Sequence, residues 1–140
     1  MDMTEKNAKQ LAYAGMVPFV ILALGCWNDQ FSLYAGRWLA GYAAVVLSFV
    51  GAVHWGIALV RPQEERRLLF SILPALSGWL VLMVSIRLAL PALAIAFVMV
   101  WQTEREQYFS WLPDWYLQLR SRLTVAVAAC LIIGWAGYLT

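Results

Sequence analysis

Apolar residues occur along this chain in long blocks that are separated by short polar or charged stretches. The first block follows the polar head MDMTEKNAKQ, and later blocks end where charged residues and prolines occur. An apolar block of about 20 residues can cross a bilayer as a helix. We therefore expect five membrane-spanning helices, over about residues 11–27, 39–60, 68–85, 90–102 and 123–139.

The third and fourth spans come from one apolar region, residues 68–101, that is interrupted by Arg87 and two prolines. A single helix of this length would extend about 51 Å, well beyond a hydrocarbon core of about 30 Å. Two spans joined by a turn between Ser85 and Leu90 instead place eight of the ten Lys and Arg residues on one side. Because positive residues concentrate on the cytoplasmic side, we expect a cytoplasmic N-terminus and a periplasmic C-terminus in a bacterial inner membrane.

The segment before the last span, about residues 104–120, carries apolar residues at three- and four-residue spacing. This pattern predicts an amphipathic helix that lies flat on the cytoplasmic surface of the membrane. We expect Trp111, Trp115 and Tyr116 to lie in the headgroup layer, and Arg120 to meet lipid phosphates.

Composition supports an all-α integral membrane bundle. Hydrophobic residues make up 63% of the chain and charged residues only 13%, whereas soluble domains are roughly 45–50% apolar and 25% charged. The net charge is +2, and no basic cluster with interleaved aromatic residues occurs. We therefore expect contact with the lipid bilayer and exclude nucleic acid as a partner.

The second span carries small residues in a regular pattern. Ala44, Ser48, Ala52 and Gly56 recur every four residues, and Gly51 lies on a different side of the same helix. Small residues let membrane helices approach each other closely. The pattern predicts helix packing on two sides of this span, with other membrane proteins or with a second copy of the chain.

The same span contains His54, the single histidine of the chain. An ionisable side chain inside a bilayer is costly and is a functional-site hypothesis by default. His54 either forms a structural hydrogen bond to a neighbouring span or handles protons or a lipophilic ligand. In the second interpretation, Ser48, Trp55 and Trp79 are its expected neighbours.

Other catalytic and metal-binding patterns are absent from the sequence. No nucleophile elbow, phosphate loop or HExxH motif occurs, and every acidic residue is expected in a loop or in the polar head. A lone histidine argues against a complete metal or bis-histidine haem site within one chain, and it leaves open a site shared across an interface. We predict no catalytic residue, no metal and no cofactor, with a quinone as the alternative ligand.

Several short motifs resemble those of a known family. They are Gly15-x-x-Pro18-Phe19, Leu47-Ser48-Phe49, Gly51-x-x-His54-Trp55-Gly56, Pro74 with Trp79, and Trp115-Tyr116-x-x-Leu119-Arg120. Together they are similar to the uncharacterised membrane family called domain of unknown function 3429. The resemblance implies a small multi-span protein of a bacterial or mitochondrial inner membrane, and it implies no particular activity.

Two functional hypotheses follow. The small residues of the second span favour a non-enzymatic subunit or assembly factor of a membrane complex. The intramembrane histidine favours a binder of a lipophilic ligand such as a quinone, or a proton-handling enzyme or carrier centred on His54.

Overall fold

A computed structural model describes residues 3–60, 67–108 and 113–140, and every regular element in these ranges is an α-helix. The five helices are α1 (Met3–Gly25), α2 (Ser32–Val60), α3 (Arg67–Val81), α4 (Ile86–Tyr108) and α5 (Asp114–Leu139). The fold is thus the all-α bundle of apolar helices that the sequence predicted.

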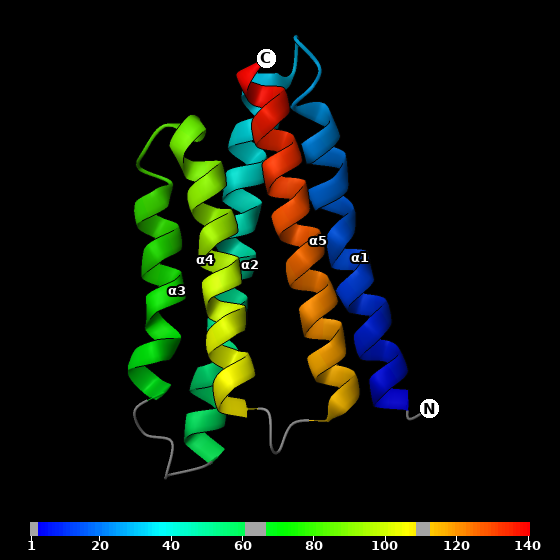
Figure 1. Ribbon diagram of the computed structural model, residues 1–140, viewed down its shortest axis with the longest axis vertical. Helices are drawn as coiled ribbons and strands as arrows, with labels where there is room; N and C mark the ends of the chain where they lie inside the picture. Colours follow the sequence, from blue (N-terminus) through cyan, green and yellow to red (C-terminus); the bar gives the residue numbers. More distant parts are fainter. Residues whose placement is uncertain (1–2, 61–66, 109–112) are drawn as a thin grey trace.

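Successive helices run in opposite directions, so the two ends of the chain lie at opposite ends of the bundle (Figure 1). We call these the N-terminal end and the C-terminal end of the bundle. A turn over residues 82–85 separates α3 from α4 and reverses the chain within the long apolar region. The predicted hairpin is confirmed, although the turn begins a few residues before Ser85.

The helices differ in their capacity to cross a membrane. Four of them, α1, α2, α4 and α5, are long and apolar enough to span a bilayer, whereas α3 is an apolar helix of only 15 residues. The predicted fourth span of residues 90–102 was too short, because α4 begins before Pro91 and continues to Tyr108. Pro91 is the sixth residue of α4, so the helix lacks the hydrogen bond that an N–H at this position would donate to the carbonyl of Arg87.

The predicted interfacial helix over residues 104–120 does not form as a separate element. Residues 104–108 continue α4, and residues 114–120 form the first two turns of α5. Glu104 and Arg120 are buried between the helices, so the described parts of this polar segment extend the bundle. Residues 109–112 lie outside the described residues.

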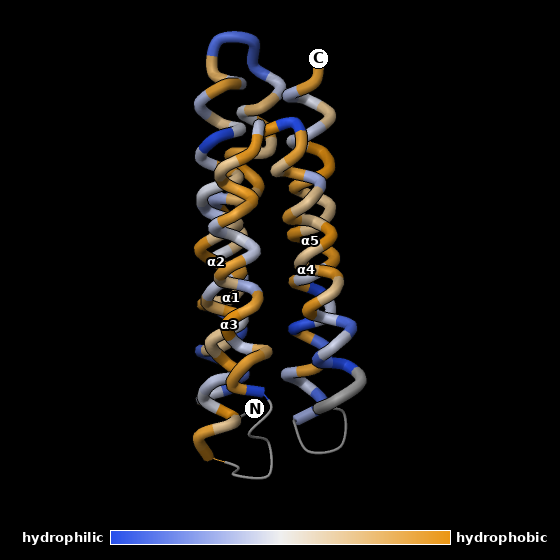
Figure 2. Tube along the Cα trace, turned by 90° about the vertical axis from the view of Figure 1, so that its left-hand side faces the viewer, coloured by the Kyte–Doolittle hydropathy of each residue, from blue (hydrophilic) through white to orange (hydrophobic). Residues whose placement is uncertain are grey.

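Helix α2 lies at the centre of the packing and contacts all four other helices. Large apolar side chains from α1, α2, α4 and α5 meet in the core, among them Phe19, Leu39, Leu47, Leu90, Leu93, Phe97 and Leu131. Hydropathy along the chain follows the same plan, with apolar residues along the helices and hydrophilic ones in α4 and α5 towards the N-terminal end (Figure 2).

Helices α2 and α3 approach each other closely at Gly51. A Cβ atom added to Gly51 would lie 2.8 Å from the backbone oxygen of Ser71 and 3.0 Å from ring atoms of Pro74. Further along, a Cβ on Gly78 would lie 3.3 Å from Ala44. Small residues on both helices therefore allow backbone-to-backbone packing, as is common in membranes.

Candidate functional site

The candidate site is a buried polar cluster near the N-terminal end, and its first member is His54 of α2. The side chain is only 3% exposed. Its place on the helix follows from the sequence, because Leu47, Gly51, His54 and Ala58 recur at the three- and four-residue spacing of one helix face. This is the face that α2 buries, so the imidazole is directed into the bundle.

Glu104 of α4 is the second member of the cluster and is 5% exposed. Its Oε1 atom lies 3.1 Å from Nε2 of His54. With the carboxylate ionised, Nε2–H of the imidazole donates and the carboxylate oxygen accepts. This bond ties α2 to α4 inside the bundle.

Arg120 and Thr124 of α5 complete the cluster. Nε of Arg120 lies 2.9 Å from Oε2 of Glu104, and Nη1 of Arg120 donates to Oγ1 of Thr124 at 2.8 Å. The threonine hydroxyl in turn donates to the backbone oxygen of Arg120 at 2.9 Å. The two side chains are 9% and 1% exposed, respectively.

Charge is balanced within this group when the imidazole is neutral, because the carboxylate of Glu104 faces the guanidinium of Arg120. Both carboxylate oxygens are occupied, one by His54 and one by Arg120. One donor is left over, since Nη2 of Arg120 is buried and has no hydrogen-bond partner among the described residues. A buried charged donor without an acceptor is costly, and such groups call for an explanation.

Three cavities adjoin the cluster. His54 lines one of about 250 Å³ between α2, α3 and α4. A second, of about 460 Å³, lies between α4 and α5 and includes both Glu104 and Arg120. A third is an apolar groove of about 470 Å³ between α1, α2, α4 and α5, and Tyr116, Arg120 and Thr124 line part of it.

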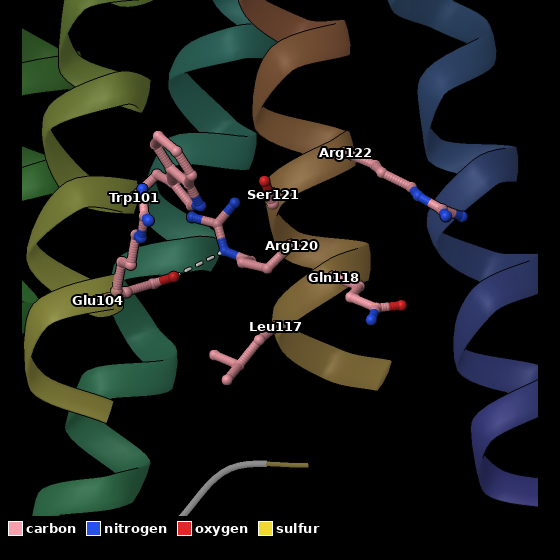
Figure 3. Close-up of a pocket in the computed structure, with 8 residues that line it drawn as sticks. Trp101, Glu104, Leu117, Gln118, Arg120, Ser121 and Arg122 are labelled. Carbon is pink, nitrogen blue, oxygen red and sulfur yellow. Dashed lines mark ion pairs between the residues drawn. The ribbon is translucent and has the colours of Figure 1, made fainter. Parts of the chain in front are cut away.

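The cavity between α4 and α5 shows how the cluster is built (Figure 3). Glu104 and Arg120 point toward each other from the two helices, and Trp101 lies one turn before Glu104 on α4. Arg122, two residues after Arg120, points away from this pair and toward α1 in this view. The cluster thus joins three helices, α2, α4 and α5, by charged and neutral hydrogen bonds.

Comparison with known proteins identifies the family of this chain. The model of a family described as "Protein of unknown function (DUF3429)" matches residues 4–136. The chain belongs to this family. The resemblance noted in the sequence is therefore confirmed.

One relative in the family is a transmembrane protein from Xenopus tropicalis named "Transmembrane protein 69", which is 30% identical over 139 residues. The match covers 91% of this chain and 53% of the relative, so the chain spans about half of the relative's length. No solved structure matches the chain. Family membership and the apolar helices together make this a multi-pass membrane protein.

The residues expected around His54 in this family member are not brought together. Trp55 is 45% exposed and Trp79 is 56% exposed, so neither indole lies with the buried imidazole. Ser48 is half-buried, and its hydroxyl donates to the backbone oxygen of Ala44 at 2.9 Å. The cavity beside His54 is lined instead by Phe70, Leu73, Pro74, Ser77, Ala96, Met99, Val100 and Thr103.

The small residues of α2 divide between two environments. Ala44 and Gly51 are buried and face α3. Ala52 and Gly56 are exposed, and a Cβ on Gly56 would meet nothing within 4 Å. One part of the predicted packing surface is thus used within the chain, and the other part is open.

Of the residues expected in the headgroup layer, Trp111 lies outside the described residues. Trp115 and Tyr116 are half-buried, and their rings meet edge to face with centroids 6.2 Å apart. The prediction for Arg120 is wrong, because this side chain is buried against Glu104 and does not lie on the surface.

Sequence reasoning missed Glu104, which was expected in a loop. A signal for its burial was present, because Leu90, Leu93, Phe97 and Glu104 share one face of α4 at spacings of three, four and seven residues. In the described parts of the chain, no group of three or more His, Cys, Asp or Glu residues could hold a metal ion.

Proposed function

We propose that this protein binds one lipophilic molecule with a polar head in the groove between α1, α2, α4 and α5. The observation that carries this proposal is the groove itself, whose walls are apolar except for a polar end at the buried cluster. Its volume of about 470 Å³ lies within the usual range of ligand pockets, about 300–1,000 Å³.

The apolar walls of the groove suit the hydrocarbon chain or the ring system of a lipophilic ligand. Phe19, Tyr42 and Phe97 form its aromatic part, with the Phe19 ring 4.8 Å from the Tyr42 ring and 6.4 Å from the Phe97 ring, centroid to centroid. The hydroxyl of Tyr42 is held by the backbone oxygen of Gly15 at 2.7 Å, so this wall is fixed before any ligand binds.

The polar end of the groove suits an oxygen-bearing head. Tyr116 and Arg120 are donors, and they line the same groove as the apolar walls. A quinone has this combination of carbonyl oxygens and an apolar tail, so it is the ligand class we propose first. The role expected of His54 becomes indirect, because His54 holds Glu104, which holds Arg120 in place.

Two neighbouring valines of α2 provide a matched test. Val46 lines the groove, whereas Val45 is 67% exposed on the outside of the bundle. The full-length protein is purified in mild detergent from its native membrane, and the retained lipophilic molecules are extracted and identified by mass spectrometry. We expect Val46→Trp to lose the retained molecule, because the indole fills the groove, and Val45→Trp to keep it.

Equal retention by both variants would refute the proposal. Retention of nothing but a mixture of bulk membrane lipids by the unmodified protein would refute it as well.

A second candidate function, a subunit or assembly factor of a membrane complex, is supported by the open part of α2. Ala52 is exposed and Gly56 has free space around it, so another helix can approach the backbone there. Gly41 also has open space, at a different point of α2.

Gly56→Leu should therefore release a co-purifying partner, whereas Gly41→Leu should not. Size analysis of the purified complex separates a foreign subunit from a second copy of this chain. If the protein runs alone in detergent that preserves other membrane complexes, this candidate fails.

We further propose that the N-terminal end of the bundle faces the cytoplasm of a bacterial cell. Arg105 lies on the last turn of α4 and Arg122 on the third turn of α5, both in the half of the bundle towards this end, and positive residues favour the cytoplasmic side. Reporter tags on the two termini should report different compartments, with the N-terminal tag in the cytoplasm. Two tags in one compartment would exclude this orientation.

A further inference from the structure

The cavity between α4 and α5 differs from the groove in the chemistry of its lining. Its eight residues are Trp101, Glu104, Arg105, Leu117, Gln118, Arg120, Ser121 and Arg122, and its volume is about 460 Å³. Three of the eight are arginines and one is an acid, so positive charge predominates. Gln118 and Ser121 add neutral hydrogen-bond donors.

The single acid in this lining is already neutralised. Glu104 gives one oxygen to His54 and the other to Arg120. Arg105 and Arg122 make no ion pair among the described residues, and the Arg105 guanidinium lies over the Trp101 ring at 5.6 Å. The positive charge of these two arginines is therefore available to a bound anion.

One nitrogen of Arg120, which also lines this cavity, lacks a hydrogen-bond acceptor. Arg120 is 9% exposed and uses Nε and Nη1 for Glu104 and Thr124. Its remaining nitrogen, Nη2, is buried and has no partner within the described ranges. Guanidinium groups bind phosphate oxygens well because their planar array of donors matches the geometry of the oxygens.

We propose that this cavity is a site for a phosphate group, of the kind carried by an anionic lipid headgroup. A phosphate oxygen supplies the acceptor that Nη2 of Arg120 lacks. Arg105 and Arg122 also line the cavity and add positive charge around it, although the Arg122 side chain is directed toward α1 (Figure 3). Basic pockets between membrane helices at the cytoplasmic side are known to hold such headgroups. The site shares Arg120 with the groove, whereas Arg105 and Arg122 line this cavity and not the groove, so these two arginines distinguish the two proposals.

The test uses the full-length protein, stripped of lipid in neutral detergent. Phosphatidylglycerol, phosphatidylcholine and inorganic phosphate are the three probes, and native mass spectrometry measures how much of each stays bound. We expect phosphatidylglycerol to bind more tightly than phosphatidylcholine, because the positive choline group of the latter opposes the arginines. Binding of inorganic phosphate, together with displacement of the lipid by it, would assign the site to free phosphate.

Paired variants locate the binding. Arg105→Gln with Arg122→Gln should weaken phosphatidylglycerol binding at least about fivefold, as expected for the loss of basic residues near a headgroup. Arg37→Gln with Arg87→Gln, two exposed arginines at the C-terminal end, should not. Because all four side chains are exposed, these changes leave the fold intact, which a thermal unfolding curve verifies.

A third variant addresses the buried nitrogen. Arg120→Lys keeps a positive charge opposite Glu104 but removes Nη2, and we expect it to weaken phosphatidylglycerol binding in the same direction. The proposal is overturned if phosphatidylglycerol and phosphatidylcholine bind equally and phosphate does not bind, or if the two paired variants behave alike. Failure of the paired variants leaves the groove proposal untouched, because Arg105 and Arg122 do not line the groove that Val46→Trp fills.

Discussion

Gly51 and His54 lie one turn apart on α2, yet they join this helix to its neighbours by opposite means. At Gly51 a missing side chain lets α3 approach until its backbone and Pro74 fill the space. At His54 a polar side chain reaches Glu104 on α4, which holds Arg120 on α5. The first junction relies on shape and the second on charge.

The two junctions tolerate change differently. Close packing fails when atoms are added, because dense interiors have no spare volume. A buried charge network fails when a partner is removed, because the remaining charge is stranded. In this protein the close contact at Gly51 is filled by the Ser71 backbone and Pro74, whereas the residues of the charged junction line three cavities. Function is therefore better sought at the charged junction.

Glu104→Gln should produce the largest loss of stability. It removes the charge that faces both His54 and Arg120, and breaking a buried pair costs about 3–5 kcal/mol. Thermal unfolding in detergent, followed by circular dichroism, measures the loss. Glu5→Gln is the matched control, because Glu5 pairs with Lys9 near the end of α1 in a more exposed setting. Similar melting of the two variants would mean that the buried network contributes little.

Gly51→Ala should produce an intermediate loss. The new methyl group meets the Ser71 oxygen at 2.8 Å, and overpacking of this kind costs about 2 kcal/mol. The same change at Gly41 meets nothing within 4 Å and, because alanine favours helix, should leave the melting temperature unchanged or slightly higher. If both alanine variants melt like the unmodified protein, α3 is not packed as closely as described.

Thr124→Val should produce the smallest loss. The side chain keeps its shape, but Nη1 of Arg120 loses its acceptor, at a cost of about 1 kcal/mol. Thr103→Val removes a hydroxyl that only donates to its own helix at Met99, so the unfolding curve should barely move. A larger loss at Thr103 than at Thr124 would contradict the assignment of the charged junction.

Much of the fold could be predicted from the sequence, because the lengths of the apolar blocks and the positions of Lys and Arg determine the number of helices and their directions. The region around Arg87 is too long for one crossing, and a turn there also explains the distribution of Lys and Arg. Helix ends were harder to place. The stretch after Trp101 is polar, so hydropathy ended the fourth span there, whereas the helix continues for almost two turns.

The site was only partly predictable, for a physical reason. His54 stands out as a lone ionisable residue in an apolar block. Its partners come from helices that are 50 and 66 residues away in the chain, and hydropathy assigns such charged residues to the surface. Trp55 was wrongly expected beside the imidazole because it follows His54 in the sequence. Successive residues on a helix point about 100° apart, so when His54 faces inward Trp55 does not.

The 15 residues of α3 also bear on the lipid around the protein. At 1.5 Å per residue this helix rises only about 22 Å, against about 30 Å for an ordinary hydrocarbon layer. Beside its exposed Leu69 and Leu80, a helix of this length would match a bilayer thinner than the one that α2 and α5 can span. Such a mismatch would favour thin regions of a membrane, and it would provide a means of sorting the protein among membranes of different thickness.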